Sequence, residues 1–361
     1  MPPLEAELRR RIAINGPLTL EAFMGLALSH PQHGYYTTRD PLGASGDFVT
    51  APEISQMFGE LIGLWAAEVW TRMGAPAPLR LVELGPGRGT LMADALRAAQ
   101  VSREFQGALD IHLVEISPAL EARQRQTLVH VGAPLSWHKS VDTLPAGPAI
   151  IIANEFFDAL PVRHYIRTAR GWCERMVGLD ASDRLSFGAS AAPEPDLKLE
   201  APYGAVLEVG ASAQRVMAQL SARIAAQGGA LLVIDYGHTE TALGETLQAL
   251  KGHQFADPLT SPGEADLTAH VDFAALARAA KASGALVSGP LPQGEFLQTL
   301  GIVQRATALK RRASSNEVTA IDSGLRRLIG SGENDMGVLF KVMAAAHPAL
   351  TSLPGFQKSA A

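Results

Sequence analysis

The chain has 361 residues, more than one average domain, so we expect a main domain with a lobe or large insertions. Its formal net charge of −5 gives no electrostatic reason to bind nucleic acid or an anionic membrane. The only cysteine, Cys173, cannot form an internal disulfide, and no apolar run approaches the roughly 20 residues of a membrane-spanning helix. The N-terminus lacks the apolar stretch of a secretory signal, so we expect a cytoplasmic protein.

The first 75 residues are predicted to form a helical region. Helices are expected over 4–14 and 18–30, followed by a loop rich in glycine and proline at 33–52. From residue 53 to residue 73, apolar side chains recur at the spacing of one helix face. This spacing predicts an amphipathic helix that covers a sheet or a lid.

After residue 75, short apolar runs alternate with helix-forming segments, which predicts an α/β fold with a parallel, doubly wound, Rossmann-like sheet. The expected strands lie at 80–84, 110–117, 136–139, 149–157, 229–237, 285–291 and 337–345. The expected helices lie at 90–99, 118–128, 212–227, 272–284 and about 293–329. The pattern therefore predicts a sheet of seven strands.

The alternation is interrupted after Pro161. Two β-rich arms around a turn near Arg170 and Gly171 predict a β-hairpin, and an Ala/Pro-rich loop follows it. We interpret this segment as an inserted arm on the substrate side and not as an independent domain. The predicted regions are an N-terminal helical part (1–75), the main domain (76–162 and 203–346), the inserted arm (163–202) and a C-terminal tail (347–361).

The segment LVELGPGRGTL places three glycines between a predicted strand and a predicted helix. Gly85, Gly87 and Gly89 permit a tight turn and let a ligand approach the backbone, while the helix start offers free N–H groups. The spacing is G-x-G-x-G and not the G-x-G-x-x-G of dinucleotide enzymes, and Glu83 precedes the first glycine by two residues. A carboxylate at this position would repel a pyrophosphate but attract the ammonium group of an amino acid.

Glu115 closes the next predicted strand. A carboxylate at this edge of a sheet can accept both hydroxyls of an adenosine ribose, and Ile116 beside it is a further candidate contact. Together with Glu83 and the glycines, this arrangement predicts S-adenosylmethionine as the cofactor. An ordinary tight turn between strand and helix is the alternative interpretation of the loop, while the glycine spacing disfavours a dehydrogenase.

The motif E-x-G-x-G-x-G resembles motif I of the Rossmann-like, class I methyltransferases. More narrowly, the chain is similar to the MidA family, which includes the mitochondrial complex I assembly factor. The likeness covers nearly the whole chain and rests on GDFVTAPEIS (46–55), FGELIGLW (58–65), VELGPGRGTL (82–91), ANEFFDALPV (153–162), VIDYG (233–237), DLTAHVDF (266–273) and QGEFLQTLGI (293–302).

This resemblance implies a seven-stranded fold with the last strand antiparallel, S-adenosylmethionine as cofactor, and protein arginine methylation as the activity. In mitochondrial relatives, the implied product is symmetric dimethylarginine on a complex I subunit. By analogy with the fold, the backbone at Val141 is expected to receive the adenine ring, with Asp142 near its exocyclic amine.

The carboxylates that follow the predicted strand at 149–157 are the candidates for acceptor binding. A guanidinium is planar, permanently charged and presents forked donors, so a site that methylates it needs carboxylates to orient it. Asn154, Glu155 and Asp158 follow the strand where a ligand beside the cofactor would lie, so we predict catalytic positions for them, with Asn154 also near the cofactor. Phe156 or Phe157 would then wall the guanidinium through cation–π contact. The alternative is that both carboxylates cap backbone turns and both phenylalanines fill the core.

Two other polar groups are weaker candidates. Asp47, Thr50 and Glu53 are predicted either to fold over the cofactor as a lid or to cap the helix that begins near Glu53. His270 is predicted either to bind the acceptor or take its proton, or to brace a loop before a helix that Asp272 caps.

Asp235 and Tyr236 end a predicted strand beside the site and are interpreted equally as contacts or as structural support. The ten histidines show no H-x₃-H or E-x-x-H spacing, so no metal site is predicted.

Three functions remain open: a protein arginine methyltransferase, a methyltransferase with a small-molecule acceptor, and a non-catalytic assembly chaperone. An open groove would favour a protein acceptor and a closed chamber a small one. The intact set of Glu83, Gly85, Gly87 and Glu115 argues against the chaperone. We therefore expect a protein partner, and neither nucleic-acid binding nor membrane insertion.

Overall fold

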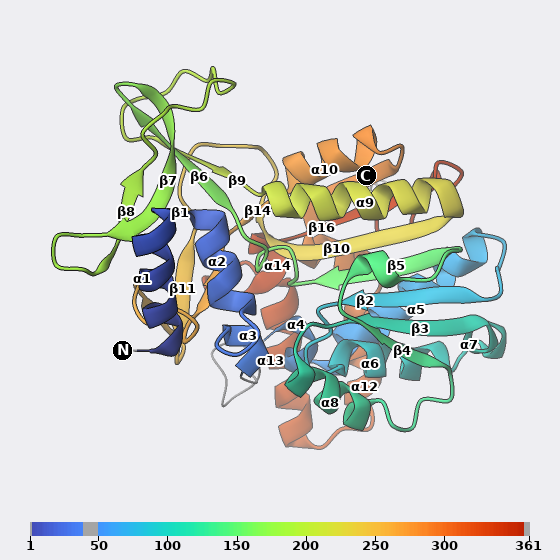
Figure 1. Ribbon diagram of the computed structural model, residues 1–361. Helices are drawn as coiled ribbons and strands as arrows, with labels where there is room; N and C mark the ends of the chain where they lie inside the picture. Colours follow the sequence, from blue (N-terminus) through green and yellow to red (C-terminus); the bar gives the residue numbers. More distant parts are fainter. Residues whose placement is uncertain (1, 39–49, 357–361) are drawn as a thin grey trace. The chain divides into compact units, whose positions relative to one another are not determined.

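The computed structural model describes residues 2–38 and 50–356, which divide into two compact units. The main-sheet unit comprises 50–157, 216–239 and 273–356, and the hairpin unit comprises 2–38, 158–215 and 240–272 (Figure 1). Each unit buries an apolar cluster of its own. Within the described residues, no helix is both long and apolar enough to cross a bilayer.

Seven strands of the main-sheet unit pair in the order β15-β16-β10-β5-β2-β3-β4. Their bounds are β2 (Leu79–Leu84), β3 (Leu109–Val114), β4 (Leu135–His138), β5 (Ala149–Asn154), β10 (Gly229–His238), β15 (Leu286–Pro292) and β16 (Phe340–Ala346). The strands from β10 to β4 pair in parallel, whereas β16 is antiparallel to both of its neighbours. The predicted α/β class is confirmed, and the sheet is mixed because its last strand runs against the others.

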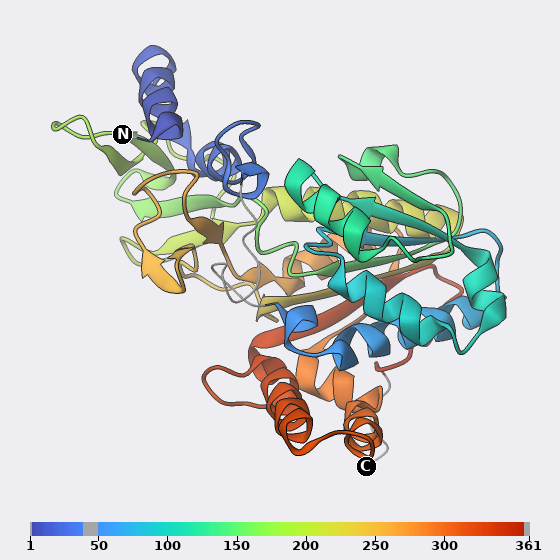
Figure 2. The same ribbon diagram turned by 90° about the horizontal axis from the view of Figure 1, so that it is seen from below.

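Helices cover both faces of this sheet, with α5 and α6 on one face and α9 on the other (Figures 1 and 2). The helices are α4 (Ala51–Ile54), α5 (Gln56–Arg72), α6 (Thr90–Ala99), α7 (Arg103–Ala108), α8 (Pro118–Thr127), α9 (Ala211–Gln227), α10 (Phe273–Ala282), α11 (Gln293–Thr299), α12 (Ile302–Lys310), α13 (Ser315–Ile329) and α14 (Met336–Leu339), with a 3₁₀ turn, η1, at Val141–Thr143. Because α9 begins at Ala211, its first residues belong to the hairpin unit and the rest to the main-sheet unit.

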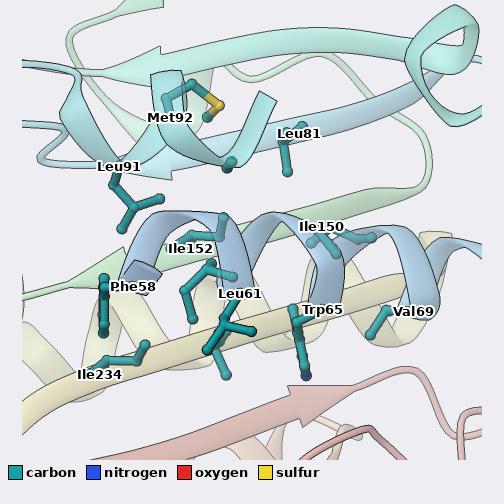
Figure 3. Packing of buried hydrophobic residues seen from close by; sticks show 14 of the residues in the cluster. Phe58, Leu61, Trp65, Val69, Leu81, Leu91, Met92, Ile150, Ile152 and Ile234 are labelled. Carbon is teal, nitrogen blue, oxygen red and sulfur yellow. The ribbon is translucent and has the colours of Figure 1, made fainter. Parts of the chain in front are cut away.

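The central strand β5 is buried along its whole length, which explains its uninterrupted apolar sequence. Successive side chains of a strand point to opposite faces, so Ile150 and Ile152 share one face. Figure 3 shows these two side chains against Leu61 and Trp65 of α5. The amphipathic stripe predicted in this helix is therefore the surface that covers the sheet.

Helices α5 and α6 approach so closely that two positions on α5 accept only glycine. A Cβ atom on Gly63 would lie 2.3 Å from the carbonyl oxygen of Ala95, and one on Gly59 would lie 2.6 Å from the Cβ of Asp94. Carbon atoms do not approach other atoms at such distances without displacing them. The glycine spacing in FGELIGLW is thus a packing requirement of the fold.

Glu60, between these glycines, anchors two arginines. Its carboxylate accepts hydrogen bonds from Arg305 at 2.7 and 2.9 Å and from Arg97 at 3.0 Å. Burial would raise the pKa of Glu60, but the two guanidinium groups outweigh it and hold the pKa below its usual value. Glu60 therefore ties α5 to α6 and α12 as an ionised group.

Two predicted helices are divided in the structure. Ser55 adopts an extended backbone (φ −160°, ψ 134°), and its hydroxyl caps the Met57 N–H at 3.3 Å, so the helix predicted from residue 53 becomes α4 and α5. The stretch at 293–329 becomes α11, α12 and α13, because Gly301 is left-handed (φ 93°) and Ser314 forms a capping box with Glu317. Capping residues inside the apolar pattern account for both differences.

The hairpin unit is built on the predicted β-hairpin, in which β6 (Arg163–Thr168) pairs antiparallel with β7 (Gly171–Leu179). Strands β1 (Leu18–Thr19), β8 (Leu185–Ala189) and β9 (Val206–Val209) extend this sheet, and β11 (Gln248–Lys251), β12 (Gln254–Ala256) and β13 (Asp266–Thr268) form a second one. Helices α1 (Pro3–Asn15), α2 (Leu20–Ser29) and α3 (Tyr35–Thr38) and strand β14 (Val271–Asp272) complete the unit. The inserted arm and the N-terminal helices thus share one unit with residues 240–272, which the sequence pattern assigns to the main domain.

Gly63→Ala should destabilise the protein by about 2 kcal/mol or more, because the new methyl group meets the α6 backbone and not a flexible side chain. Urea denaturation of both variants measures the change. Gly107→Ala is the matched control, since a Cβ there meets nothing within 4 Å and helix propensity favours alanine by up to about 1 kcal/mol. Equal stability of the two variants would contradict the close approach of α5 and α6.

Candidate functional site

The turn between β2 and α6 passes through three left-handed glycines. Gly85, Gly87 and Gly89 have φ angles of 59°, 53° and 82°. Other residues adopt this region only at an energetic cost, so the turn requires glycine at these positions. Gly89 is also the residue that caps the start of α6 at Thr90. The predicted strand–turn–helix geometry of the glycine loop is therefore present.

Glu83 is buried in β2, two residues before this turn, and is 3% exposed. Its Oε2 atom has no hydrogen-bond partner among the described residues. Burial raises the pKa of Glu83 to about 8; a hydrogen bond from the Met92 backbone lowers it, and the charge of Glu115 adds to the increase. An incoming cation is the group that would favour the ionised carboxylate at this position.

Glu115 follows β3, and hydrogen bonds fix both of its carboxylate oxygens. Oε1 accepts the Ser117 N–H at 2.7 Å, and Oε2 accepts the Gln124 side-chain amide at 3.0 Å. Burial raises the pKa of Glu115, and these hydrogen bonds oppose that increase. Ile116 next to it is 42% exposed, which leaves an apolar surface beside the carboxylate.

Gln124 on α8 is a site residue that the sequence reasoning does not identify. Its side-chain amide also donates to the Gly87 carbonyl at 2.8 Å, and its oxygen accepts the indole N–H of Trp137 at 3.0 Å. It lies between Leu120 and Leu128 at four-residue spacing and, like them, is buried. A glutamine in the middle of an apolar helix stripe is the signal that points to such a role.

The segment after β4 is held mainly by its own hydroxyl groups and by α9. Val141 and Asp142 lie in η1, and the Asp142 carboxylate accepts hydrogen bonds from the Ser140 hydroxyl at 2.7 Å and from the Gln219 amide. The Ser140 hydrogen bond, followed by that of Gln219, lowers the pKa of Asp142. Asp142 is therefore an exposed acceptor held in a defined orientation.

The end of β5 brings two of the predicted catalytic residues together. Asn154 donates through Nδ2 to the Glu155 Oε1 atom at 3.1 Å, and the same oxygen accepts the Ala51 N–H at 3.0 Å. The Oδ1 atom of Asn154 is buried and lacks a hydrogen-bond partner within the described residues. Glu155 has a φ angle of 50°, a strained conformation for a residue with a side chain. The predicted capping alternative is thus present, since Glu155 accepts the first N–H of α4.

The turn after Glu155 is fastened by Asp235. The Asp235 carboxylate is fully buried and accepts the Phe157 N–H at 3.0 Å. The neighbouring ring of Phe156 lies against the glycine loop, because a Cβ atom on Gly85 would be 3.2 Å from it. Phe157 is buried and meets Phe156 edge-on, at 5.4 Å between ring centroids. The two rings therefore differ: Phe157 fills the core, and Phe156 borders the loop.

The short helix α4 links the β5 exit to the start of α6. Glu53 accepts the Thr90 hydroxyl at 2.5 Å, while the Ala51 N–H contacts Glu155. Thr50 is the residue before α4 and makes no side-chain cap of that helix. Asp47 lies outside the described residues.

Asp158 and His270 belong to the hairpin unit, in adjoining segments. The Asp158 carbonyl accepts the Ala269 N–H at 3.0 Å, and the His270 N–H donates to the Thr246 hydroxyl at 2.8 Å. The Asp158 side chain is 7% exposed. Asp272, next in this segment, accepts the Thr241 hydroxyl at 2.6 Å just before α10.

A half-buried tyrosine is part of the same unit. The Tyr36 hydroxyl donates to the Asp266 carboxylate at 2.8 Å. Burial, followed by the charges of Asp266 and Asp158, raises the pKa of Tyr36 well above its usual value. The hydroxyl therefore stays protonated and acts as a donor. No group of three His, Cys, Asp or Glu side chains in residues 2–38 and 50–356 is arranged to hold a metal ion.

The comparisons with known proteins agree with this geometry. A family model described as "Putative S-adenosyl-L-methionine-dependent methyltransferase" matches residues 61–291, more than half of the chain. The chain is 39% identical over 336 residues to "Protein arginine methyltransferase NDUFAF7, mitochondrial" of Danio rerio, which covers 86% of this chain and 78% of the relative. It is 38% identical over 342 residues to the protein of that name from Homo sapiens, covering 88% of this chain and 77% of the relative.

A solved structure adds the cofactor. The crystal structure of a "likely methyl transferase" from Burkholderia thailandensis bound to S-adenosyl-homocysteine has a TM-score of 0.86 and 29% identity, over 98% of this chain and 94% of that chain. The residues of this chain fit the group, because Gly85 at the start of the loop is exposed and Glu83 Oε2 has no partner in the described part of the chain. S-adenosylmethionine is therefore the cofactor, as predicted.

The expected cytoplasmic location is wrong, because the curated relatives are named as mitochondrial proteins. A single cysteine excludes a disulfide framework but does not distinguish one reducing compartment from another. The predicted family resemblance, by contrast, is confirmed. The chain belongs to the family of S-adenosylmethionine-dependent methyltransferases that includes the mitochondrial protein arginine methyltransferases NDUFAF7.

Proposed function

We propose that this chain transfers the methyl group of S-adenosylmethionine to an arginine side chain of a protein. The observation that carries the proposal is Glu155, a strained carboxylate held by Asn154 and by the α4 backbone. It is followed directly by Phe156, whose ring lies against Gly85 of the glycine loop. The names of relatives that share 38–39% of their residues with this chain support arginine as the acceptor.

The proposed cofactor contacts follow from this arrangement. When bound, the cofactor supplies an electrophilic methyl group on a sulfonium. Glu83 would bind the ammonium of its amino-acid part, and Glu115 would accept the ribose hydroxyls. The remaining proposed contacts are Gly85, Gly87, Gly89, Ile116, Val141, Asp142, Asn154, Asp47 and Thr50.

The proposed catalytic task of Glu155 is orientation. A carboxylate that accepts guanidinium N–H groups fixes the plane of the acceptor and thus the direction from which its nitrogen attacks. Asn154 would hold Glu155 in place through the hydrogen bond to Oε1. Asp158 and His270 are further proposed contacts to the acceptor, with His270 as a candidate to take its proton.

A test of the reaction uses the full chain, methyl-labelled cofactor and extract from cells that lack the gene. We expect label on arginine of a protein, located by mass spectrometry, with complex I subunits as the first candidates because the family resemblance implies them. If label appears only in small solutes, the acceptor is a small metabolite and not a protein. No label, despite binding of S-adenosylhomocysteine measured by calorimetry, would support a non-catalytic assembly role.

Glu155→Gln should lower methyl transfer by about a hundredfold or more, because the amide keeps an acceptor for the Ala51 N–H but loses the charge that binds a guanidinium. The dissociation constant for S-adenosylhomocysteine should change by less than about threefold. Initial rates and calorimetric titration measure the two effects. Glu104→Gln, at an exposed position on α7, is the control and should alter neither. If the variant lost S-adenosylhomocysteine binding and methyl transfer to the same extent, Glu155 would have a structural role and would not orient the acceptor.

Binding of S-adenosylhomocysteine should tighten as the pH rises towards 8. Glu83, with a pKa of about 8, is mostly protonated at neutral pH and must lose its proton to pair with an ammonium group. The affinity should therefore increase by up to about tenfold per pH unit below 8 and then level off. Calorimetry in two buffers of different ionisation enthalpy would detect the released proton.

Glu83→Gln is the control for this effect and should bind S-adenosylhomocysteine more weakly, with little dependence on pH.

The free energy of unfolding of the protein without ligand gives a second measurement of the Glu83 pKa. Because folding raises the Glu83 pKa from 4.5 to about 8, the folded state binds more protons than the unfolded state between these values. This contribution to the free energy of unfolding is therefore lost as the pH rises, and the Gln variant should lack that loss. A pH-independent affinity in the wild type would contradict the ammonium contact.

A further inference from the structure

The Gln124 side chain makes three hydrogen bonds in a site from which solvent is fully excluded. It is 0% exposed. It contacts the Gly87 carbonyl in the glycine loop, the Glu115 carboxylate after β3, and the Trp137 indole on β4. These three elements are consecutive along one edge of the cofactor site, and Gln124 is the residue that joins them.

The chemistry of these partners fixes the orientation of the amide. An indole N–H can only donate, so the Gln124 oxygen must face Trp137. The NH₂ group then faces a carbonyl and a carboxylate, both of which only accept when Glu115 is ionised. The opposite orientation would place a donor against a donor and an acceptor against two acceptors. The amide therefore has one satisfactory orientation, which holds both acceptors in place.

Glu115 retains acceptor capacity for a ligand in this arrangement. Each carboxylate oxygen has two lone pairs; the Ser117 N–H donates to Oε1, Gln124 donates to Oε2, and the Ile116 N–H also interacts with the carboxylate. These donors fix the plane of the carboxylate and leave acceptor capacity for a ligand hydroxyl. A bare carboxylate on a flexible side chain would have to be ordered when the ligand binds, at a cost in affinity.

We propose that Gln124 is a positioning residue that orients Glu115 toward the ribose hydroxyls of the cofactor and fixes the peptide of Gly87. The inference rests on the proposed role of Glu115. It assigns to α8 a function in cofactor recognition, through a side chain that does not touch the cofactor. The loop and the carboxylate are then a single preorganised surface and not two independent contacts.

The test compares S-adenosylhomocysteine with the analogue that lacks both ribose hydroxyls, using calorimetry on the full chain. The wild type should bind the analogue about a hundredfold more weakly, as expected for lost hydrogen bonds to a charged group. Gln124→Leu should bind S-adenosylhomocysteine about tenfold more weakly and distinguish the two ligands by only about tenfold. A merely structural role would weaken both ligands equally and leave the hundredfold ratio intact, which would overturn the proposal.

Two further variants complete the test. Gln126→Leu changes the same residue type at an exposed position of the same helix and should leave both affinities unchanged. If Gln124→Leu fails to fold, Gln124→Glu keeps the shape and an acceptor for Trp137 but places a second carboxylate against Glu115, so the discrimination should again fall. A wild type that binds S-adenosylhomocysteine without discriminating the analogue would instead refute the role of Glu115, and the inference with it.

Discussion

The constraint on which the site depends is the left-handed backbone between β2 and α6. Three residues with positive φ angles turn the chain from a buried strand into a helix within five positions, and only glycine tolerates this without strain. At these three positions the loop carries no side chain, so the groups around them define the site. Glu83 is buried in the strand before the loop, Gln124 hydrogen-bonds both the Gly87 carbonyl and Glu115, and Phe156 lies against Gly85.

A small number of directional hydrogen bonds hold this turn and the segments around it. Gln124 fastens the Gly87 carbonyl, Glu53 fastens Thr90 at the start of α6, and Asp235 fastens the turn after β5. Asp235 is a fully buried carboxylate, which is costly unless hydrogen-bonded and therefore favours one geometry over its alternatives. The closely packed α5 and α6 supply the rigid support behind them, because Gly59 and Gly63 allow no space between the helices.

The strands, the main helices and the glycine loop could be predicted from the sequence because each has a local signal: an apolar run, a helical stripe, or glycines at a strand end. The breaks at Ser55 and Ser314 could not, since a capping serine and an interior serine look alike until the backbone is known. The role of Gln124 could not be predicted because its hydrogen-bond partners Gly87 and Trp137 are distant from it in sequence. The strained backbone of Glu155 likewise has no signature in an apolar strand followed by a carboxylate.

Each unit is assembled from three separate stretches of the chain. Neither unit therefore corresponds to a continuous coding segment, and no truncation yields one of them alone. A continuous fragment that contains all of one unit also contains long stretches of the other. Separate production of the main-sheet unit would require two new connections in place of residues 158–215 and 240–272, one from residue 157 to residue 216 and one from residue 239 to residue 273.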